Sequence, residues 1–254
     1  MKVYKDRKTC YQKLCKEKQK EHEERIEYDK STAIVKEIST LEAKALILKY
    51  EWLGTMPTNP WKQFGLYLND RLVAVECFIR SKPGGLYTLF HYPAICLARG
   101  ASISYAPIWA GSYLISKSLK ILAKEFKVPH FVLAYADWEA GELGHIYQAC
   151  SWVYLGTQKL PEWETPDGSR RDDKYHRDQA KKLDSNYKIN KKLNPKYPKQ
   201  VWNDLIKKGW KRSSKIRGRY ATVVGGSKSQ KRKLLKLLEK SKKSYVKTHE
   251  IIKI

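Results

Sequence analysis

The stretch from residue 131 to residue 156 constrains the fold of this chain most strongly, because two apolar runs flank a short segment of glycine and polar residues. The first run, 131–136, ends in the carboxylate of Asp137, and the second run covers 152–156. Tyr147 lies between them, in a segment that favours a short helix. The pattern therefore predicts a strand, a short helix and a second strand. Open α/β sheets bind ligands beyond the carboxyl ends of their strands, so we expect an active site near Asp137.

Similar patterns predict a mixed α/β protein along most of the remaining chain. The expected elements are a helix over 38–49 with Thr40 as its cap, hairpin strands over 64–68 and 72–79, a strand over 94–99, a helix over 111–126, a helix from 201, a strand over 219–224 and a helix capped by Ser227. They fall into four regions: a charged N-terminal helix or arm over 1–35, a catalytic core over 36–160, a linker or excursion over 161–200, and a basic α+β extension over 201–254 packed on or beside the core.

The chain has a formal net charge of +25, and most of this positive charge lies in its last third. Residues 1–169 carry 23 Lys and Arg against 19 Asp and Glu, whereas residues 170–254 carry 28 against 7. Folding does not need such an excess, and it indicates a polyanionic partner, most commonly nucleic acid. The chain has neither an apolar run long enough to span a membrane nor a signal-peptide pattern, so we expect no membrane partner and a cytoplasmic location.

The order of the expected elements resembles the fold of the Gcn5-related N-acyltransferases (GNAT). The resemblance implies a mixed central sheet flanked by helices, in which two central strands splay apart and the acyl donor lies between them. A tyrosine on the helix after the fifth strand often acts there as general acid, and Tyr147 occupies the corresponding place. Members usually hold the coenzyme A pyrophosphate with a loop of spaced glycines. The equivalent loop here, 99–107, has one glycine, which argues against ordinary coenzyme A binding.

Residues 135–156 resemble a narrower family more specifically. The segments Tyr135-Ala136-Asp137, Gly141, Gly144, Ile146-Tyr147-Gln148-Ala149, Trp152, Tyr154 and Gly156 look like the central motif of the Mom proteins. Segments within 51–56, 64–67, 97–101 and 209–220 agree in order, so the resemblance covers roughly residues 45–240. It implies a bacteriophage DNA-modification enzyme that transfers a carbamoylmethyl (glycinamide-like) group to adenine N6 and protects the DNA from restriction. Such a protein would work in the cytoplasm of a bacterial host.

The resemblance places Asp137 and Tyr147 at positions implicated in activity. Tyr147 would donate a proton or orient the leaving group of the donor, and Asp137 or Glu51 would take a proton from adenine N6 or orient it. Glu51-Trp52 stands where the best-known members carry a His-aromatic pair, with Lys49-Tyr50 as the alternative alignment. The simpler alternatives are that Asp137 caps the following helix and that Tyr147 is an ordinary packed aromatic residue.

Aromatic and basic residues complete the expected site. Trp52 and Tyr67 are the candidates for stacking an adenine flipped out of the duplex, and Arg99 and Ser102 are the candidates for binding substrate in the loop over 99–107. Phosphate contacts to double-stranded DNA are expected from the densest basic patch of the C-terminal region, which consists of Lys207, Lys208, Lys211, Arg212, Lys215, Arg217 and Arg219.

The residues do not identify a cofactor. The reaction needs an acyl or aminoacyl donor, and acetyl-coenzyme A and an aminoacyl-tRNA are both candidates; a tRNA would also suit the basic region. Iron has been proposed for the Mom family, but Asp137 and Glu51 alone do not predict a metal site. Two other functions stay open: a coenzyme A-dependent N-acetyltransferase acting on protein or a small molecule, and a non-catalytic nucleic-acid-binding protein.

Overall fold

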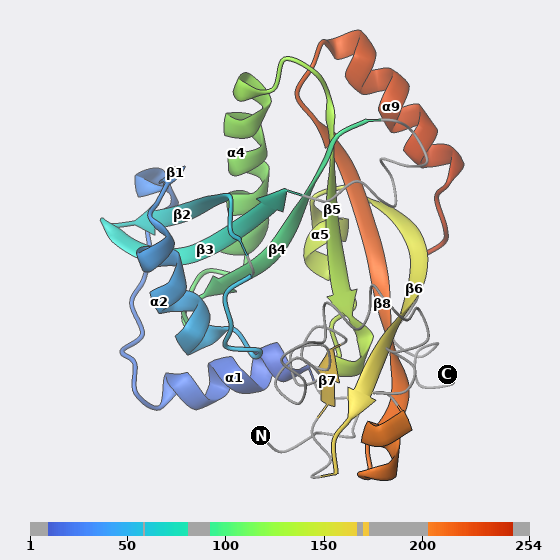
Figure 1. The fold of residues 1–254 in the computed structure, drawn as a ribbon. Helices are drawn as coiled ribbons and strands as arrows, with labels where there is room; N and C mark the ends of the chain where they lie inside the picture. Colours follow the sequence, from blue (N-terminus) through green and yellow to red (C-terminus); the bar gives the residue numbers. More distant parts are fainter. Residues whose placement is uncertain (1–9, 58, 81–91, 167–169, 173–202, 246–254) are drawn as a thin grey trace.

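The computed structural model describes residues 10–57, 59–80, 92–166, 170–172 and 203–245. Within these ranges one sheet holds eight strands in the order β1-β2-β3-β4-β5-β8-β6-β7 (Figure 1). The expected hairpin and the strand, short helix and strand of 131–156 are confirmed. Most of the region 161–200 and the start of the helix expected from 201 lie outside the described residues. The strands are β1 (Ile34–Glu37), β2 (Lys62–Leu68), β3 (Arg71–Arg80), β4 (Ala94–Ser102), β5 (His130–Asp137), β6 (Val153–Glu164), β7 (Arg170–Asp172) and β8 (Lys211–Val224).

The strands β4 and β5 separate at their carboxyl ends. They form the parallel pair of the sheet, and their pairing extends only from Ala94 and Phe131 to Leu97 and Ala134. Beyond it β4 continues to Ser102 and β5 to Asp137, and Figure 1 shows the two strands diverging. This separation and the strand order are what the GNAT resemblance implies. The expected acyltransferase-like fold is therefore confirmed.

The strand β8 lies inside the sheet, although it comes from the region that the sequence suggested as an extension. It pairs with β5 along one edge and with β6 along the other, both antiparallel. Its residues Ala221 and Val223 are buried. The hydrophobic core therefore includes residues of this strand.

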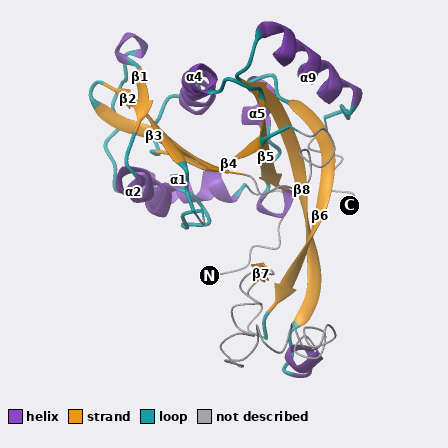
Figure 2. Ribbon diagram, turned by 45° about the horizontal axis from the view of Figure 1, so that its top comes forward, coloured by secondary structure: helices purple, strands orange, loops and turns teal. Residues whose placement is uncertain are grey.

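Beyond the end of β5, β6 and β8 continue as a projecting ribbon, which Figure 2 shows from the side. The β5–β8 pairing ends at Asp137 and Arg217, whereas β6 and β8 stay paired from Gln158 and Arg217 to Glu164 and Lys211. Near the tip, β7 adds to the outer edge of β6, and a helical segment over 203–207 precedes β8 in the chain. We call residues 158–164 and 211–217 the distal ribbon.

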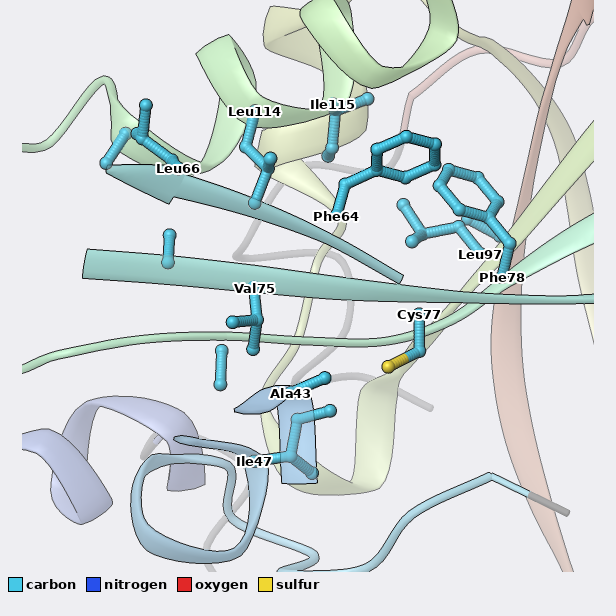
Figure 3. Close-up of a cluster of buried hydrophobic side chains, with 14 of the residues drawn as sticks. Ala43, Ile47, Phe64, Leu66, Val75, Cys77, Phe78, Leu97, Leu114 and Ile115 are labelled. Atoms are coloured by element: carbon cyan, nitrogen blue, oxygen red, sulfur yellow. The ribbon is translucent and has the colours of Figure 1, made fainter. Parts of the chain in front are cut away.

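Helices cover both faces of the sheet and enclose its core. Figure 3 shows Val75 and Cys77 of β3 directed toward Ala43 and Ile47 of α2, whereas Leu114 of α4 lies on the opposite side of the strands. A second cluster forms where α9 packs on β8 and β6. No helix in the described part of the chain has the length and apolar character needed to cross a membrane. The helices are α1 (Tyr11–Lys20), α2 (Thr40–Tyr50), α4 (Ala110–Glu125), α5 (His145–Ala149) and α9 (Lys228–Lys240).

Two of these helices begin with a capping box. The expected cap Ser227 is confirmed, because its hydroxyl accepts a hydrogen bond from the Gln230 backbone N–H at 3.2 Å. For α2 the expected cap, Thr40, is wrong by one residue. Ser39 has the extended backbone of a cap, and its hydroxyl accepts from the Glu42 N–H while the Glu42 carboxylate accepts from the Ser39 N–H. A glutamate three residues beyond a serine is the signal for this arrangement.

Gly144 begins α5, the helix that carries Tyr147. Its φ of +72° lies in the left-handed region that favours glycine. A Cβ at this position would lie only 2.3 Å from a carbon of the Tyr220 ring on β8. The Tyr220 hydroxyl donates a hydrogen bond to the Leu143 carbonyl at 2.6 Å, which restrains that ring. Backbone conformation and close packing therefore both require glycine here.

We expect the substitution Gly144→Ala to lower the free energy of unfolding by about 2–4 kcal/mol, because the backbone strain and the contact with Tyr220 add. Urea unfolding measures the loss. The matched control is Gly100→Ala, whose added Cβ would meet only the Val75 carbonyl oxygen, at an ordinary distance of 3.6 Å. The control should change stability by no more than about 0.5 kcal/mol. Equal losses in the two variants would contradict this account of α5.

Candidate active site

Asp137 ends β5 directly opposite Arg217 of β8, since the antiparallel register pairs these two residues. Its Oδ2 lies 3.6 Å from Arg217 Nε and 3.8 Å from Lys215 Nζ. The residue is 8% exposed, so the pairing with two cations offsets part of the cost of burying its charge. The N-cap of α5 is Gly144, so Asp137 does not cap that helix. The carboxylate is instead held at the end of β5 by two basic side chains of β8.

Glu51 follows α2 directly and is almost completely buried. Its Oε2 accepts a hydrogen bond from the Gly54 N–H at 3.0 Å, and its Oε1 lies 4.0 Å from Arg99 Nε on β4. Burial raises the pKa of Glu51 to about 7, a rise that the charge of Arg99 opposes and the charge of Glu142 reinforces. A carboxyl group with a pKa near neutrality suits proton transfer at physiological pH.

The alternative pair, Lys49 and Tyr50, has different partners. Lys49 Nζ lies 3.1 Å from a carboxylate oxygen of Glu23, and the Tyr50 hydroxyl donates to the same oxygen. Both side chains therefore contact the N-terminal region. Glu51 instead lies beside Arg99, and the charge of Glu142 affects its pKa.

Trp52 links α2 to the end of β5 through Glu142, a residue that the sequence reasoning missed. The Trp52 indole Nε1–H donates to Glu142 Oε1 at 2.9 Å, and the Asp137 backbone N–H donates to Glu142 Oε2 at 3.2 Å. The other side of Trp52 contacts the ring of Tyr11 on α1 edge to face, with 5.5 Å between centroids. Glu142 carried no signal beyond its acidic side chain, because its partner Trp52 lies 90 positions away in the sequence.

Tyr147 of α5 lies among aromatic rings. Its ring centroid is 5.3 Å from that of Trp152 and 5.2 Å from that of Tyr220. Burial raises the pKa of the Tyr147 hydroxyl well above its ordinary value, and the charge of Glu142 raises it further. The hydroxyl keeps its proton at neutral pH, but the raised pKa makes it a weaker acid than an ordinary tyrosine. The ring is also packed among aromatic residues, so the catalytic role of Tyr147 stays a prediction.

The loop after β4 is occupied by side chains from the N-terminal region. The Ser104 backbone N–H donates to Glu23 Oε2 at 3.3 Å, and Lys16 Nζ donates to the Ser102 hydroxyl at 2.5 Å. The Glu23 side chain is only 6% exposed. A loop that cradles a pyrophosphate offers its N–H groups to the phosphate oxygens. Here a carboxylate from the same chain already takes one of them, so the residues do not fit ordinary coenzyme A binding.

Not every predicted residue lies near the cluster of Glu51, Trp52, Asp137 and Glu142. The Tyr67 hydroxyl donates to Glu42 in the first turn of α2 at 3.0 Å. Glu51 and Trp52 follow the last turn of that helix, about 15 Å away for an 11-residue helix. Tyr67 therefore lies near the other end of α2. Arg99 and Ser102 do lie at the parted end of β4.

The predicted phosphate-binding patch divides into two parts. Lys207, Lys208, Lys211 and Arg212 are exposed near the tip of the distal ribbon. Lys215 and Arg217 instead contact Asp137, and Arg219 donates from Nη2 to the Leu155 carbonyl at 3.2 Å. The density of basic residues in the sequence could not separate these two groups, because the division depends on which residues lie beside β5.

The carboxylates of Asp137 and Glu51 are the candidate ligands for a metal ion. Among the described residues, no group of three or more His, Cys, Asp and Glu side chains could hold a metal ion. Asp137 is paired with Arg217 and Lys215, and Glu51 lies beside Arg99. These carboxylates do not fit an iron site.

Comparisons with known proteins give one family and two distant structural likenesses. An acetyltransferase of the GNAT family from Streptococcus pneumoniae shares 11% identity over 50% of this chain and 88% of its own, at a TM-score of 0.35. A conserved protein of unknown function from Enterococcus faecalis V583, described as a probable N-acyltransferase, shares 15% identity over 54% of this chain and 36% of its own, also at 0.35. Both likenesses are too weak to argue from, and the fold assignment rests on the strand order and the separation of β4 and β5. No curated protein sequence matches.

The family model of the Mom proteins matches residues 32–245. This span begins just before β1 and ends beyond α9. It therefore includes β4 and β5, the carboxylates of Glu51, Asp137 and Glu142, and the distal ribbon. The chain belongs to the Mom protein family.

Proposed function

We propose that this protein is a DNA-modifying transferase that adds a carbamoylmethyl group to adenine N6 and so protects DNA from restriction. The observation that carries the proposal is the match to the Mom family over residues 32–245, which includes Asp137 and Tyr147. A transferase is the class that the family and the acyltransferase-like fold support. We further propose that the substrate is adenine, that the transferred group is carbamoylmethyl, and that the protein works in the cytoplasm of a bacterial host.

The chemistry assigns separate roles to the acidic and phenolic groups. Adenine N6 is a poor nucleophile because its lone pair is delocalised into the ring, so it needs positioning and a nearby base. In the reaction N6 bonds to the transferred carbon, the bond from that carbon to the donor's leaving group breaks, and N6 loses one proton. We assign acceptance of this proton to Glu51, orientation of the amino group to Asp137, and proton donation to the leaving group to Tyr147.

The distal ribbon provides a surface for DNA. A two-stranded ribbon fits the major groove, and Lys159, Lys211 and Arg212 are exposed on this one. Basic side chains there would contact phosphates and supply affinity without sequence choice. An adenine flipped from the duplex could then reach the parted ends of β4 and β5 while the ribbon holds the flanking backbone.

A coenzyme A-dependent acetyltransferase is the main alternative, and the fold is the observation in its favour. The carboxylate of Glu23 at the Ser104 N–H argues against it, as does the single glycine of the 99–107 loop. An aminoacyl-tRNA would avoid the need for that loop and would suit the basic surface, but attack of N6 on its ester carbonyl, with the ribose hydroxyl leaving, would give the isomeric N6-glycyl amide and not the carbamoylmethyl product. Incubating the purified protein and duplex DNA with each donor separately distinguishes them.

Nucleoside mass spectrometry of DNA from cells that express the protein tests the proposal. The expected result is a modified deoxyadenosine with the mass of the carbamoylmethyl product. The isomeric N6-glycyl amide has the same mass, so fragmentation of the modified base must identify the linkage. Unmodified adenine in cells that contain folded protein and an intact donor supply would contradict the proposal and leave a nucleic-acid-binding protein as the alternative.

We expect Asp137→Asn and Tyr147→Phe each to lower the amount of modified adenine by about 100-fold or more, because each removes a group that orients or protonates a reactant. The mark is quantified in DNA from cells with matched protein levels. The control is Tyr113→Phe, a tyrosine of α4 whose ring packs on Trp109, and it should leave the mark unchanged. A full mark from the Asp137 and Tyr147 variants would remove both residues from the site.

The rate of modification should rise with pH through about 7, since the Glu51 carboxyl must be deprotonated to accept a proton and its pKa is raised to about 7. Below that pH the group is protonated and the rate falls. The measurement is the single-turnover rate across this range, once a donor is known. Glu51→Gln should be slow and should lose this pH dependence, whereas an unchanged profile would exclude Glu51 as the base.

Replacing Lys211 or Arg212 by alanine should weaken DNA binding equally for different sequences. Each exposed residue that neutralises a phosphate should reduce the slope of log affinity against log salt by about 1. Titrations of labelled duplex at several salt concentrations measure the slope. Lys44→Ala, which removes an exposed charge from α2, is the control and should leave the slope unchanged; an equal change in all three variants would argue against the ribbon as the DNA surface.

A further inference from the structure

Glu142 contacts both the segment after α2 and the end of β5. One carboxylate oxygen accepts the indole N–H of Trp52 at 2.9 Å, and the other accepts the backbone N–H of Asp137 at 3.2 Å. One donor belongs to the segment after α2, and the other is the last residue of β5. A single carboxylate therefore joins the segment after α2 to the end of β5.

The backbone of Glu142 strengthens this arrangement. Its own N–H donates to the Asp137 carbonyl at 3.0 Å, so Asp137 and Glu142 exchange two hydrogen bonds that close the turn after β5. This turn leads directly to Gly144 and α5. The position of the Glu142 side chain is therefore determined by the same turn that presents Asp137 and begins the helix of Tyr147.

We propose that Glu142 is a positioning residue of the active site, whose carboxylate holds the Trp52 indole at the carboxyl end of β5 beside Asp137. The proposal rests on the DNA-modifying function proposed above, because it concerns the geometry of that reaction. Trp52 is the aromatic residue of this cluster expected to stack the target adenine. The hydrogen bond from the indole N–H to Glu142 fixes the orientation of the Trp52 ring. A base stacked on that ring would then have a fixed orientation relative to the Asp137 carboxylate.

The two contacts use both oxygens of the Glu142 side chain. Both partners of Glu142 are N–H donors, and a carboxylate accepts at both of its oxygens. A glutamine offers one acceptor oxygen and one NH₂ group, so it can satisfy only one of the two donors. Glu142→Gln therefore keeps the size of the side chain and breaks one half of the link.

Removing the charge also changes the surroundings of Glu51 in a defined direction. The charged and titratable groups that face Glu51 are Arg99 on β4, Glu142 in the turn after β5 and Cys15 on α1. A like charge raises the pKa of a neighbouring carboxyl. The Glu51 pKa should therefore fall in Glu142→Gln, while a residue that only packs would not move it.

The experiment is carbon NMR of the full-length protein labelled at the glutamate carboxyl carbons, with Glu51 identified by the Glu51→Gln variant. In Glu142→Gln we expect the Glu51 titration midpoint to move to lower pH and the Trp52 indole N–H resonance to shift. Modification of adenine should fall by about 100-fold, the effect of a small displacement of a reacting group. The control is Glu239→Gln on α9, which makes the same charge change beside Lys242 and should alter none of these.

An unchanged Glu51 midpoint and an unchanged Trp52 resonance in folded Glu142→Gln would overturn the proposal, whatever the reaction of the protein is. Full activity in that variant, with wild-type protein marking DNA, would also overturn it. If wild-type protein makes no mark, the proposed function fails while the two NMR readouts still decide whether the link exists. Should Glu142→Gln not fold, Trp52→Phe removes one N–H donor and must raise the Glu142 pKa; no rise would overturn the proposal.

Discussion

The antiparallel pairing of β8 with both β5 and β6 is the interaction on which the site depends. Because β8 enters between these strands, Asp137 stands directly opposite Arg217, and the position of Tyr220 determines which residue can begin α5. A shift of one residue in this register would turn the basic side chains of β8 away from Asp137. The same strand continues into the distal ribbon, so the parts that we assign to chemistry and to DNA binding share one rigid element.

Charge at the site is distributed rather than concentrated. Asp137 has two cationic neighbours and Glu51 has one, whereas Glu142 accepts hydrogen bonds from two N–H groups. Burial raises the pKa values of Glu51 and Glu142, so both carboxyl groups hold a proton more readily than an ordinary glutamate. Active sites commonly separate acid and base roles in this way, by giving similar groups different surroundings.

The sequence predicted the parts of this architecture that depend on local pattern. The alternation and turn residues of 64–79 predicted the hairpin, and the apolar run before Asp137 predicted β5 and the position of its carboxylate. The place of β8 between β5 and β6 was not predicted, because strand neighbours far apart in sequence leave no periodic signal. The same reason explains Glu142, whose partner Trp52 belongs to a distant segment. Tyr67 shows the converse case, because its segment matches the family pattern while its hydroxyl contacts Glu42 in the first turn of α2, at the other end of that helix from Glu51 and Trp52.

The described N-terminal residues contribute to the site although the family match begins at residue 32. Tyr11 packs against Trp52, Lys16 reaches Ser102, and Glu23 takes the Ser104 N–H. The contacts of Lys16 and Glu23 occupy the loop that would hold a pyrophosphate in an ordinary acyltransferase, and they argue against ordinary coenzyme A as the donor.

The most direct test of the central claim is tandem mass spectrometry of the adenine base from duplex DNA incubated with purified protein and a fractionated bacterial extract as the donor source. The expected product is adenine with a carbamoylmethyl group whose fragments place it on N6, formed only when the protein is present. Unmodified adenine throughout, or a group on another base with adenine intact, would contradict it.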